Sequence, residues 1–288
     1  MSKIILITGA SSGFGRDTAK TLAQAGHRVF ASMRDVAGRN KAHAEALRAQ
    51  DIDVVELDVT DDASVERGVK SVFAQTGRID VVINNAGIGS LNVSEAFTTS
   101  QLRELFDVNV FGVQRVLRAV LPFFRSQHEG LIVNIGSVLG RVTVPFFGLY
   151  GASKFALEAI TETYRYELSQ LGIDVVLVQP SSYPTSIFAS AQVPDDTARV
   201  DAYGDLGAIP QKIAQTIASS FEGKNAPNPH DVAKAIRGIV EQPKGARPAR
   251  TVVGESFGAD VLNAQAASVQ TQLLEGLGLA QLAQTRIA

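Results

Sequence analysis

Short apolar runs alternate with longer amphipathic stretches through the first 180 residues, and few folds accommodate this alternation. The apolar runs predict strands at residues 3–7, 28–31, 54–57, 81–83, 131–135 and 175–178. The stretches between them predict helices at residues 13–25, 41–49, 63–74, 100–126 and 150–171. Strands separated by helices pair in parallel, and right-handed crossovers then cover both faces of the sheet. The sequence therefore predicts an α/β fold, a Rossmann-type doubly wound parallel sheet with helices on both faces.

The pattern weakens after Pro180. Residues 181–225 hold several prolines and glycines without a clear core face, which is typical of a mobile segment with short helices. Further helices are predicted at residues 212–221, 230–241 and 265–282, and a last strand at residues 251–253. No repeat or low-complexity linker divides the chain, so we predict a single domain over residues 1–288.

Composition excludes several classes of protein. The chain has no cysteine, so disulfides, thiolate nucleophiles and cysteine metal sites are excluded, and its four histidines lack metal-ligand spacing. A net charge of -2 without long runs of one sign argues against nucleic acid as a partner. The N-terminal apolar run is too short for a signal peptide, and no segment has the length of a membrane span. We therefore expect a cytoplasmic protein without a membrane partner.

A glycine-rich turn follows the first predicted strand. It reads Thr8-Gly9-Ala10-Ser11-Ser12-Gly13-Phe14-Gly15 and leads directly into a predicted helix. The N–H groups and the dipole at a helix N-terminus attract a pyrophosphate, and glycine lets the backbone come close. Alone this turn is a weak signal, but the strand before it and the helix after it are the setting that a dinucleotide site requires. A P-loop is disfavoured, since Arg16-Asp17 stand where a Lys-Ser/Thr pair would be.

The end of the second strand should distinguish NADP(H) from NAD(H). An acidic residue there would bind the ribose 2′-hydroxyl and repel a 2′-phosphate. Met33 occupies that position, and Arg34 follows with a guanidinium that suits a phosphate. We therefore favour NADP(H). Asp35 keeps NAD open as the alternative, and Arg34 could also be a solvated surface charge.

Tyr150 and Lys154 open a long helical pattern and lie four residues apart, so both project from one face of the helix. A free tyrosine has a pKa of about 10, too high for efficient proton transfer at neutral pH. A nearby ammonium group is expected to lower this pKa. Ser137 ends the fifth predicted strand, where folds of this type place ligands, and its hydroxyl could bind the reacting oxygen.

On these residues the chain resembles the short-chain dehydrogenase/reductase family, in its simple rather than its extended branch. The resemblance covers residues 3–180, and the motifs that carry it occur in the family's order. They are the glycines at 9, 13 and 15, Asp58-Val59, Asn84-Asn85-Ala86-Gly87, Asn109, Ser137, Tyr150 and Lys154. One departure follows the sixth strand, where Pro180-Ser181 replaces the usual Pro-Gly. If that position needs a positive φ, serine would be strained there.

The resemblance implies a role for each matching residue. Tyr150 would donate or accept the proton, Lys154 would lower its pKa and hold the nicotinamide ribose, Ser137 would position the substrate oxygen, and Asn109 would link Lys154 to solvent through water. A nicotinamide ring would supply the hydride, and no metal is needed. The expected cofactor-binding residues are Gly9, Ser11, Ser12, Gly13, Phe14, Gly15, Arg34, Asp58, Val59, Asn85, Ala86, Gly87, Tyr150, Lys154, Pro180 and Thr185.

Apolar and aromatic residues surround the predicted catalytic residues. Substrate contacts are expected from Ser137, Leu139, Phe147, Tyr150, Tyr183 and Phe188, with Ile88, Leu91, Val138, Val144, Phe146 and Ile187 as further candidates. Except for Arg141, no arginine or lysine stands ready to bind a carboxylate or phosphate. We therefore expect a bulky hydrophobic ketone or secondary alcohol as substrate.

The functional hypothesis is thus an NADP(H)-dependent carbonyl reductase or alcohol dehydrogenase. Residues 1–180 would form the cofactor and catalytic core, residues 181–225 a substrate lid and residues 260–288 a helical tail. The resemblance also implies a homodimer or homotetramer. The alternatives are an NAD-dependent dehydrogenase, a nucleotide-sensing regulatory protein without turnover, and a dehydratase or epimerase on the same fold.

Overall fold

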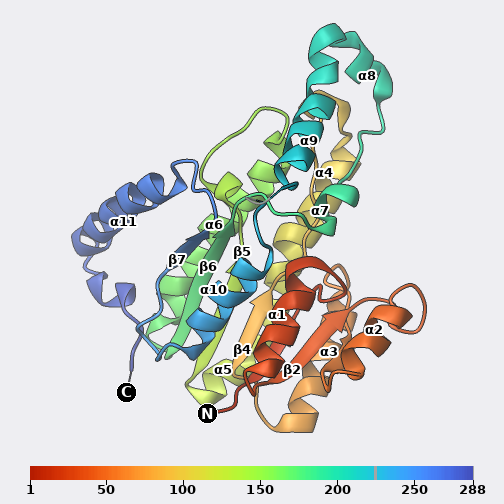
Figure 1. Cartoon of the computed structure of the whole chain (residues 1–288). Coiled ribbons are helices and arrows are strands. Elements are labelled where there is room, and N and C mark those ends of the chain that lie inside the picture. Colours follow the sequence, from red (N-terminus) through yellow and green to blue (C-terminus); the bar gives the residue numbers. More distant parts are fainter. Residues whose placement is uncertain (224–225, 288) are drawn as a thin grey trace.

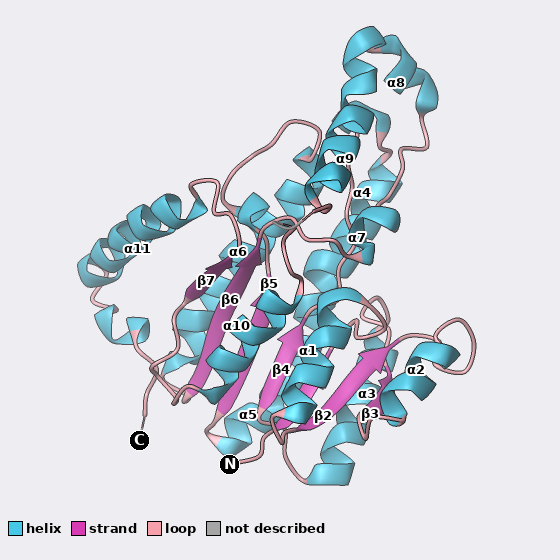
Figure 2. Ribbon diagram, in the orientation of Figure 1, coloured by secondary structure: helices cyan, strands magenta, loops and turns pink. Residues whose placement is uncertain are grey.

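The computed structural model describes residues 1–223 and 226–287, and its centre is one seven-stranded sheet. All strand pairs are parallel, in the order β3-β2-β1-β4-β5-β6-β7. The strands, magenta in Figure 2, are β1 (Ile4–Ile7), β2 (Arg28–Met33), β3 (Asp53–Glu56), β4 (Val81–Asn84), β5 (Gly130–Ile135), β6 (Ile173–Pro180) and β7 (Arg250–Val253). The order reverses between β1 and β4, which confirms the predicted Rossmann-type doubly wound sheet.

Two layers of helices bury the two faces of this sheet, in a single domain (Figure 1). One layer consists of α1 (Gly13–Gln24), α2 (Lys41–Arg48) and α10 (His230–Glu241). The other consists of α3 (Asp62–Thr76), α5 (Gly112–Gln127) and α6 (Gly148–Ser169). The strands are apolar on both faces because each face meets a helical layer, as expected of a parallel sheet.

The long helix predicted at residues 100–126 is helical throughout residues 99–127, with one irregular turn inside it. α4 (Thr99–Phe106) and α5 are joined by a π-helical turn at Asp107–Phe111, which contains Asn109. Apolar periodicity alone does not reveal such a turn, because its cause is tertiary. The Asn109 side chain accepts a hydrogen bond from the Ile88 backbone N–H at 2.9 Å and donates one to the Ile88 carbonyl oxygen at 2.9 Å. π-turns are frequent at functional sites.

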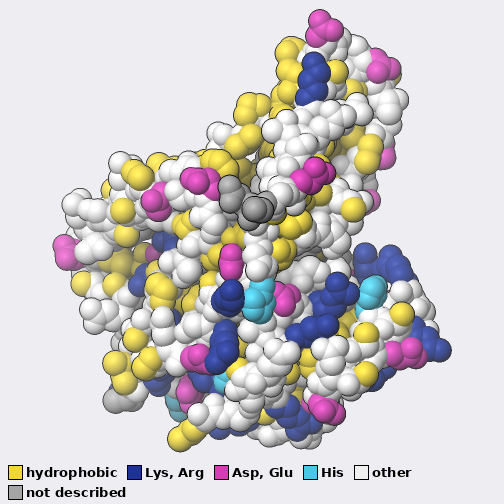
Figure 3. Space-filling view, in the orientation of Figure 1, with side chains coloured by type: hydrophobic (Ala, Val, Ile, Leu, Met, Phe, Trp, Pro, Cys, Tyr) yellow, Lys and Arg dark blue, Asp and Glu magenta, His cyan; other side chains and the backbone are white. Residues whose placement is uncertain are grey.

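The segment after β6 rises above the carboxyl ends of the strands. It contains α7 (Ser186–Ala189), α8 (Thr197–Ala202) and α9 (Ile209–Ser220), and Figure 1 shows it projecting beside α4 with α8 at the far tip. Figure 3 shows hydrophobic side chains gathered at the base of this projection, while most Lys and Arg side chains lie over the lower half of the molecule. α11 (Ala259–Gly276) lies on the opposite side, next to β7.

The last helix begins six residues earlier than predicted. α11 begins at Ala259 rather than at 265 and ends at Gly276, before a separate short 3-10 turn at Ala280–Ala283. Its inner face is built from small and polar side chains such as Asn263, so an apolar pattern could not locate its start. Within the described ranges, no helix is both long enough and apolar enough to span a bilayer.

A chain of buried side-chain hydrogen bonds joins the sheet to α6. Asn84 of β4 donates to Asn134 of β5 at 2.8 Å, and Asn134 donates to Thr161 of α6 at 2.9 Å. All three residues are at most 4% exposed. Because an unpaired buried polar group is costly, this chain fixes the rotation of α6, the helix that carries Tyr150 and Lys154.

Replacing Asn134 with leucine should destabilise the fold. Asn134→Leu leaves the Asn84 Nδ2 group without its acceptor and takes one of two hydrogen bonds from the Thr161 hydroxyl, which still donates to the Leu157 carbonyl oxygen. We therefore expect the free energy of unfolding to fall by about 2–3 kcal/mol. Urea denaturation followed by circular dichroism measures this change. Gln265→Leu, which replaces an amide on the exposed face of α11, is the control. Equal stabilities of the two variants would contradict a structural role for the chain of amides.

Candidate active site

Two adjoining cavities open at the carboxyl edge of the sheet. The first lies over the ends of β1, β2 and β3, and the second over the ends of β5 and β6; each has a volume of about 340 Å³. They share the walls formed by Phe14, Asn85, Gly87, Thr185 and Ile187. One ligand could therefore extend from the first cavity into the second. This is the switch point of the strand order, where doubly wound sheets bind ligands.

The glycine-rich turn forms the floor of the first cavity. Gly9 and Gly13 have φ angles of +65° and +51°, which favour glycine. A Cβ at position 9 would lie 2.7 Å from the Ala86 Cα atom. The helix that follows has no side-chain cap from Ser12, so N–H groups of its first turn remain available to an anion. The geometry fits the pyrophosphate of a dinucleotide.

Gly15 and Asn85 hold this turn in shape. A Cβ at Gly15 would lie 2.4 Å from Asn85 Nδ2 and 2.6 Å from the Gly9 carbonyl oxygen. The Asn85 amide donates to the Thr8 and Gly9 carbonyl oxygens at 2.9 and 3.0 Å. Gly15, predicted to bind the cofactor, is buried and does not line the cavity. Its absent side chain instead lets β4 and the turn pack together.

Arg34 lines the far end of the first cavity, and Asp35 does not. Asp35 has a φ of +52°, and its carboxylate accepts a hydrogen bond from the Arg39 N–H at 2.9 Å within its own loop. The Arg34 guanidinium is about half exposed and lies 4.0 Å from the Asp58 carboxylate. Asn40, which sequence analysis missed, also lines this end and donates to the Arg34 carbonyl oxygen at 2.6 Å.

Ser137, Tyr150 and Lys154 all line the second cavity. Ser137 lies two residues after the end of β5, and its hydroxyl accepts a hydrogen bond from the Leu139 N–H at 3.1 Å. Tyr150 and Lys154 lie one turn apart near the start of α6, with the Lys154 ammonium 5.7 Å from the centre of the Tyr150 ring. That ammonium donates to the Ile135 carbonyl oxygen at 2.8 Å. The tertiary fold thus brings together three side chains that are up to 17 residues apart in the sequence.

Burial dominates the protonation of these groups. It raises the pKa of Tyr150 to about 12, while a hydrogen bond with Ser137 opposes this shift. Burial also lowers the pKa of Lys154 to about 8. The expectation that Lys154 lowers the pKa of Tyr150 is therefore not met by the protein groups alone. The apolar walls disfavour both charged forms, and the ammonium is bonded to a backbone carbonyl rather than to the phenol.

Asn109 lies behind Gly87, close to Lys154. A Cβ at Gly87 would lie 3.3 Å from Asn109 Oδ1 and 3.8 Å from Lys154 Nζ, so glycine keeps the space between them open. Besides its two bonds to Ile88, the Asn109 amide donates to the Ser153 hydroxyl at 3.0 Å. These three hydrogen bonds hold the Asn109 side chain between Ile88 and Ser153. The predicted water-mediated link between Asn109 and Lys154 stays a prediction.

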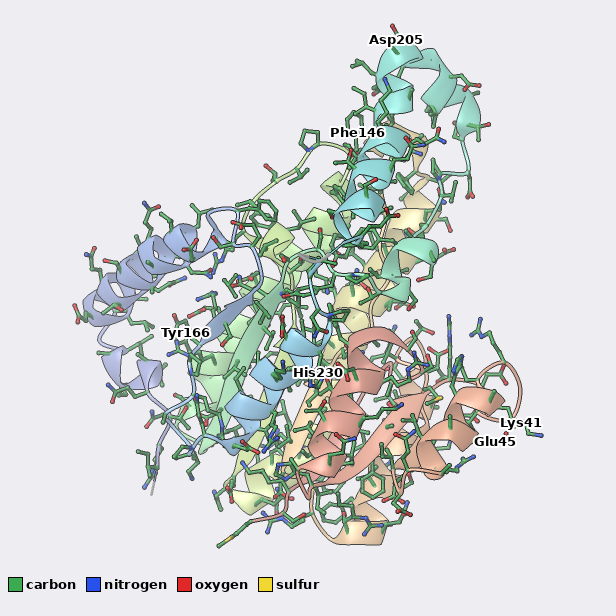
Figure 4. The ribbon with its side chains drawn as sticks, in the orientation of Figure 1. Lys41, Glu45, Phe146, Tyr166, Asp205 and His230 are labelled. Carbon is green, nitrogen blue, oxygen red and sulfur yellow. The ribbon has the colours of Figure 1, made fainter. Side chains whose placement is uncertain are left out.

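The six residues expected to contact substrate line the second cavity, together with apolar side chains that sequence analysis missed. Of the further candidates, Leu91, Val138, Val144 and Ile187 line it, but Ile88 and Phe146 do not. Phe146 has a φ of +68° and lies in the loop before α6, labelled in Figure 4. The missed residues include Ile213, Ile217 and Phe257. The isoleucines, four residues apart on α9, were detectable by their spacing, whereas nothing local marks Phe257.

Ser181 is accommodated without backbone strain. It has no positive φ, so the concern raised by the missing glycine does not hold. The neighbouring strand supplies a glycine instead. Gly254, with a φ of +86°, lies where a Cβ would come within 2.3 Å of the Ser181 hydroxyl and 2.7 Å of the Tyr183 hydroxyl. Pro180 and Thr185 line the second cavity on either side of this segment.

Comparison with known proteins places the chain among related enzymes. The sequence model of the family described as short chain dehydrogenase matches residues 3–195. The chain is 35% identical over 252 residues to a 3-ketodihydrosphingosine reductase from Bacteroides thetaiotaomicron, covering 88% of each protein. It is 32% identical over 250 residues to retinol dehydrogenase 8 from Bos taurus, covering 78% of this chain and 80% of that protein.

Solved structures show the same fold. A short-chain dehydrogenase from Streptomyces avermitilis superposes with a TM-score of 0.77 at 31% identity, covering 98% of both chains. An alcohol dehydrogenase from Thermococcus sibiricus with 5-hydroxy-NADP has a TM-score of 0.69 at 26% identity, covering 88% and 96%. A Burkholderia phymatum relative with NAD has a TM-score of 0.75 at 26% identity, covering 94% and 95%. These complexes support a nicotinamide cofactor without distinguishing its two forms.

A methyl group at position 15 should weaken cofactor binding. In Gly15→Ala the new Cβ must push Asn85 or the Gly9 carbonyl away, so the phosphate-binding turn widens. We expect the dissociation constants of NADPH and NADH to rise at least about 10-fold, or about 1.4 kcal/mol. Fluorescence titration measures them. Gly238→Ala on α10, where a Cβ meets open space, is the matched control. Unchanged affinity in Gly15→Ala would show that the cofactor does not use this turn.

Proposed function

This chain belongs to the short-chain dehydrogenase/reductase family, and from that premise we propose that it is an NADP(H)-dependent oxidoreductase of bulky hydrophobic ketones or secondary alcohols. One observation carries the proposal. Ser137, Tyr150 and Lys154 share the wall of an apolar cavity that is continuous with a groove suited to a dinucleotide. Hydroxyl donors beside a hydride source are what carbonyl reduction requires.

The chain's own residues supply the proton and orient the substrate. When bound, the nicotinamide cofactor supplies or accepts the hydride. Tyr150 donates its phenolic proton to the carbonyl oxygen in reduction and accepts the proton of the hydroxyl in oxidation. Ser137 donates a hydrogen bond to the same oxygen and holds it beside Tyr150. Because burial raises the pKa of Tyr150 to about 12, the phenol keeps its proton at neutral pH. It gives up this proton in reduction only as hydride addition turns the carbonyl oxygen into an alkoxide, which is a stronger base than the phenolate.

The walls of the second cavity support a hydrophobic substrate. In the part of the chain that the structure describes, Lys154 is the one charged side chain that lines it, and most of the other lining residues are apolar. A ligand bearing a carboxylate or phosphate would find no second cation among these lining residues. Two relatives are named for a 3-ketodihydrosphingosine and for retinol, and both names denote largely apolar molecules. The cavity suits one reacting oxygen on an otherwise apolar ligand.

The first cavity supports NADP(H) over NAD(H). Arg34 presents a guanidinium at the end that would receive the adenosine ribose, and Asn40 braces its backbone. Asp35, the acidic residue that would favour NAD, is turned into its own loop. An NAD-dependent dehydrogenase is the second candidate, because Asp58 also lines this cavity and its carboxylate could receive a ribose hydroxyl.

A regulatory protein that binds nucleotide without turnover is disfavoured, because all four predicted catalytic positions are filled and gathered at one site. We further propose that residues 181–223 act as a lid, since Ile213 and Ile217 of α9 line the second cavity. The last two residues of the predicted lid, 224 and 225, lie outside the described residues. A homodimer or homotetramer is proposed as well, because Phe111 and Phe155 are 50% and 40% exposed on neighbouring elements.

A direct assay tests the proposed activity. The protein is incubated with NADPH and a panel of aromatic and long-chain ketones, and the loss of the reduced cofactor's absorbance is followed. Turnover of apolar ketones supports the proposal. Cofactor binding without turnover across the panel supports the regulatory alternative, and a higher kcat/KM for small charged keto acids would overturn the hydrophobic substrate class.

Removing the phenolic hydroxyl should abolish most of the activity. Tyr150→Phe keeps the ring but loses the proton donor, so we expect kcat to fall by about 10²-fold or more while cofactor affinity is retained. Steady-state kinetics and cofactor titration measure the two effects. Tyr164→Phe, on the same helix but bonded to Gln114, is the control. Near-normal turnover in Tyr150→Phe would remove this residue from its proposed role.

Arg34 should determine the choice of cofactor. Arg34→Ala is expected to raise the KM for NADPH by about 10-fold or more and to leave the KM for NADH nearly unchanged, since only NADPH carries the 2′-phosphate. Arg39→Ala removes an equal charge from the same exposed loop without touching the cavity. Equal effects of Arg34→Ala on both cofactors would exclude Arg34 as the phosphate ligand.

A further inference from the structure

A buried charged residue lies directly behind the loop that follows Ser137. Glu158 is one turn beyond Lys154 on α6, and its side chain is 4% exposed. Its carboxylate lies 3.1 Å from the guanidinium groups of Arg141 and Arg250, and it accepts a hydrogen bond from the Gln179 amide. Arg141 is the fourth residue after Ser137, and Gln179 directly precedes Pro180. Glu158 thus binds both segments that border the reacting groups.

The contacts continue into the C-terminal helix. Asn263 of α11 accepts a hydrogen bond from Arg141 Nε at 2.9 Å and donates one to Gln179 Oε1 at 2.7 Å. On its other side, Arg250 forms an ion pair with Glu162, and the Glu162 carboxylate also accepts a hydrogen bond from the Tyr166 hydroxyl. Tyr166 is labelled on the α11 side of the molecule in Figure 4. We call these side chains the Glu158 network, namely Arg141, Glu158, Glu162, Gln179, Arg250 and Asn263.

The stem of Glu158 also separates α6 from the Ser137 loop. A Cβ at Gly140 would lie 3.0 Å from Glu158 Cγ and 3.1 Å from the Lys154 carbonyl oxygen. The short 3-10 turn Val138–Gly140 therefore rests on Glu158 and on the backbone of α6. The spacing between Ser137 and Tyr150 depends on this contact, since Ser137 opens that turn and Tyr150 lies in the first turn of α6.

These buried ion pairs are better explained by the geometry they impose than by the stability they add. Burying charged groups is costly, and a protein in which apolar residues of similar volume replace a buried ion pair is often equally stable or more stable. Glu158 is also not the counter-ion of the catalytic lysine, because the Lys154 ammonium donates to the Ile135 carbonyl oxygen. The hydrogen bonds of Glu158 have fixed directions, which apolar packing could not supply. They bind the two segments that carry Ser137 and Pro180.

We propose that Glu158 is a positioning residue for the reaction, which holds the Ser137 loop at its working distance from Tyr150 and, through Asn263, ties the C-terminal helix to the active site. The proposal rests on the proposed oxidoreductase function. Asn263 stands six residues after Phe257, which lines the substrate cavity. The helix after β7 is therefore part of the catalytic unit.

Glu158→Gln tests the first part. The amide keeps the size but leaves Arg141 without the carboxylate it pairs with and Arg250 with Glu162 alone, so the Ser137 loop shifts. We expect kcat for ketone reduction to fall by about 10-fold or more, with the cofactor dissociation constant within about 2-fold of the parent. The hydrogen bond from Ser137 opposes the raised pKa of Tyr150, so weakening it shifts the rise of the alcohol oxidation rate with pH to higher pH.

The control for this variant is Glu167→Gln, the same change on the exposed side of α6. We expect it to match the parent in kcat and in pH profile. A purely structural role for Glu158 would lower the melting temperature and leave both kcat and the pH profile at the parent's values, and that result would overturn the proposal.

Asn263→Ala tests the link to α11 without removing a charge. We expect KM for an apolar ketone to rise by about 3- to 10-fold with a smaller change in kcat, because the wall that contains Phe257 loses its anchor. Gln265→Ala, which removes an amide from the exposed face of the same helix, is the matched control and should behave as the parent. Equal KM values for the two variants would show that α11 has no influence on the active site and would contradict this part of the proposal.

Amide hydrogen exchange separates this proposal from the proposed function, because it needs no turnover. In Glu158→Gln, peptides covering residues 137–141 and 257–263 should exchange faster than in Glu167→Gln, while the glycine-rich turn stays unchanged. If the parent lacks ketone turnover but these peptides exchange faster in Glu158→Gln, the proposed substrate class fails and the positioning role stands. If exchange is unchanged, the positioning role fails whatever the activity.

Discussion

The uniform direction of the seven strands is the constraint on which the rest of the molecule depends. Parallel strands send their carboxyl ends to one edge, so the glycine-rich turn, Asn85, Ser137 and Pro180 all leave the sheet on the same side. The reversal of strand order between β1 and β4 opens the space there. The cofactor groove and the substrate cavity share walls because both are built from these adjacent strand ends.

The second cavity is lined mainly by apolar side chains, and its low polarity governs the protonation of the groups in its wall. Burial raises the pKa of Tyr150 and lowers that of Lys154, so both groups are pressed toward their neutral forms. A neutral phenol next to a serine hydroxyl is arranged to donate a proton to a carbonyl oxygen. Among the described residues, the same walls offer a charged substrate no cation besides Lys154. The proton transfer and the hydrophobic substrate class that we propose thus rest on one property, the low polarity of the surroundings.

Local patterns in the sequence were sufficient for the sheet, the glycine-rich turn and the pair Tyr150 and Lys154, whereas the family resemblance supplied most of the other candidate site residues. The strands and α10 were placed within a few residues, because apolar runs and helical periodicity depend on near neighbours. The π-turn at Asn109 was missed because it depends on bonds to Ile88, 21 residues earlier. Phe257 and the partners of Glu158 were missed for the same reason. Their neighbours are distant in the chain, and no local pattern records them.

The sequence by itself determined the chemistry available to this protein, because the motifs that carry it are local. The glycine-rich turn lies at the end of one strand, and Tyr150 and Lys154 lie one turn apart on one helix. Only the tertiary structure decided how these parts act together. It turned Asp35 away from the cofactor groove, supplied Gly254 beside Ser181, and tied α11 to the Ser137 loop through Asn263. Periodicity fixes which side chains share an element, but the distances between elements are set by packing across the whole sheet.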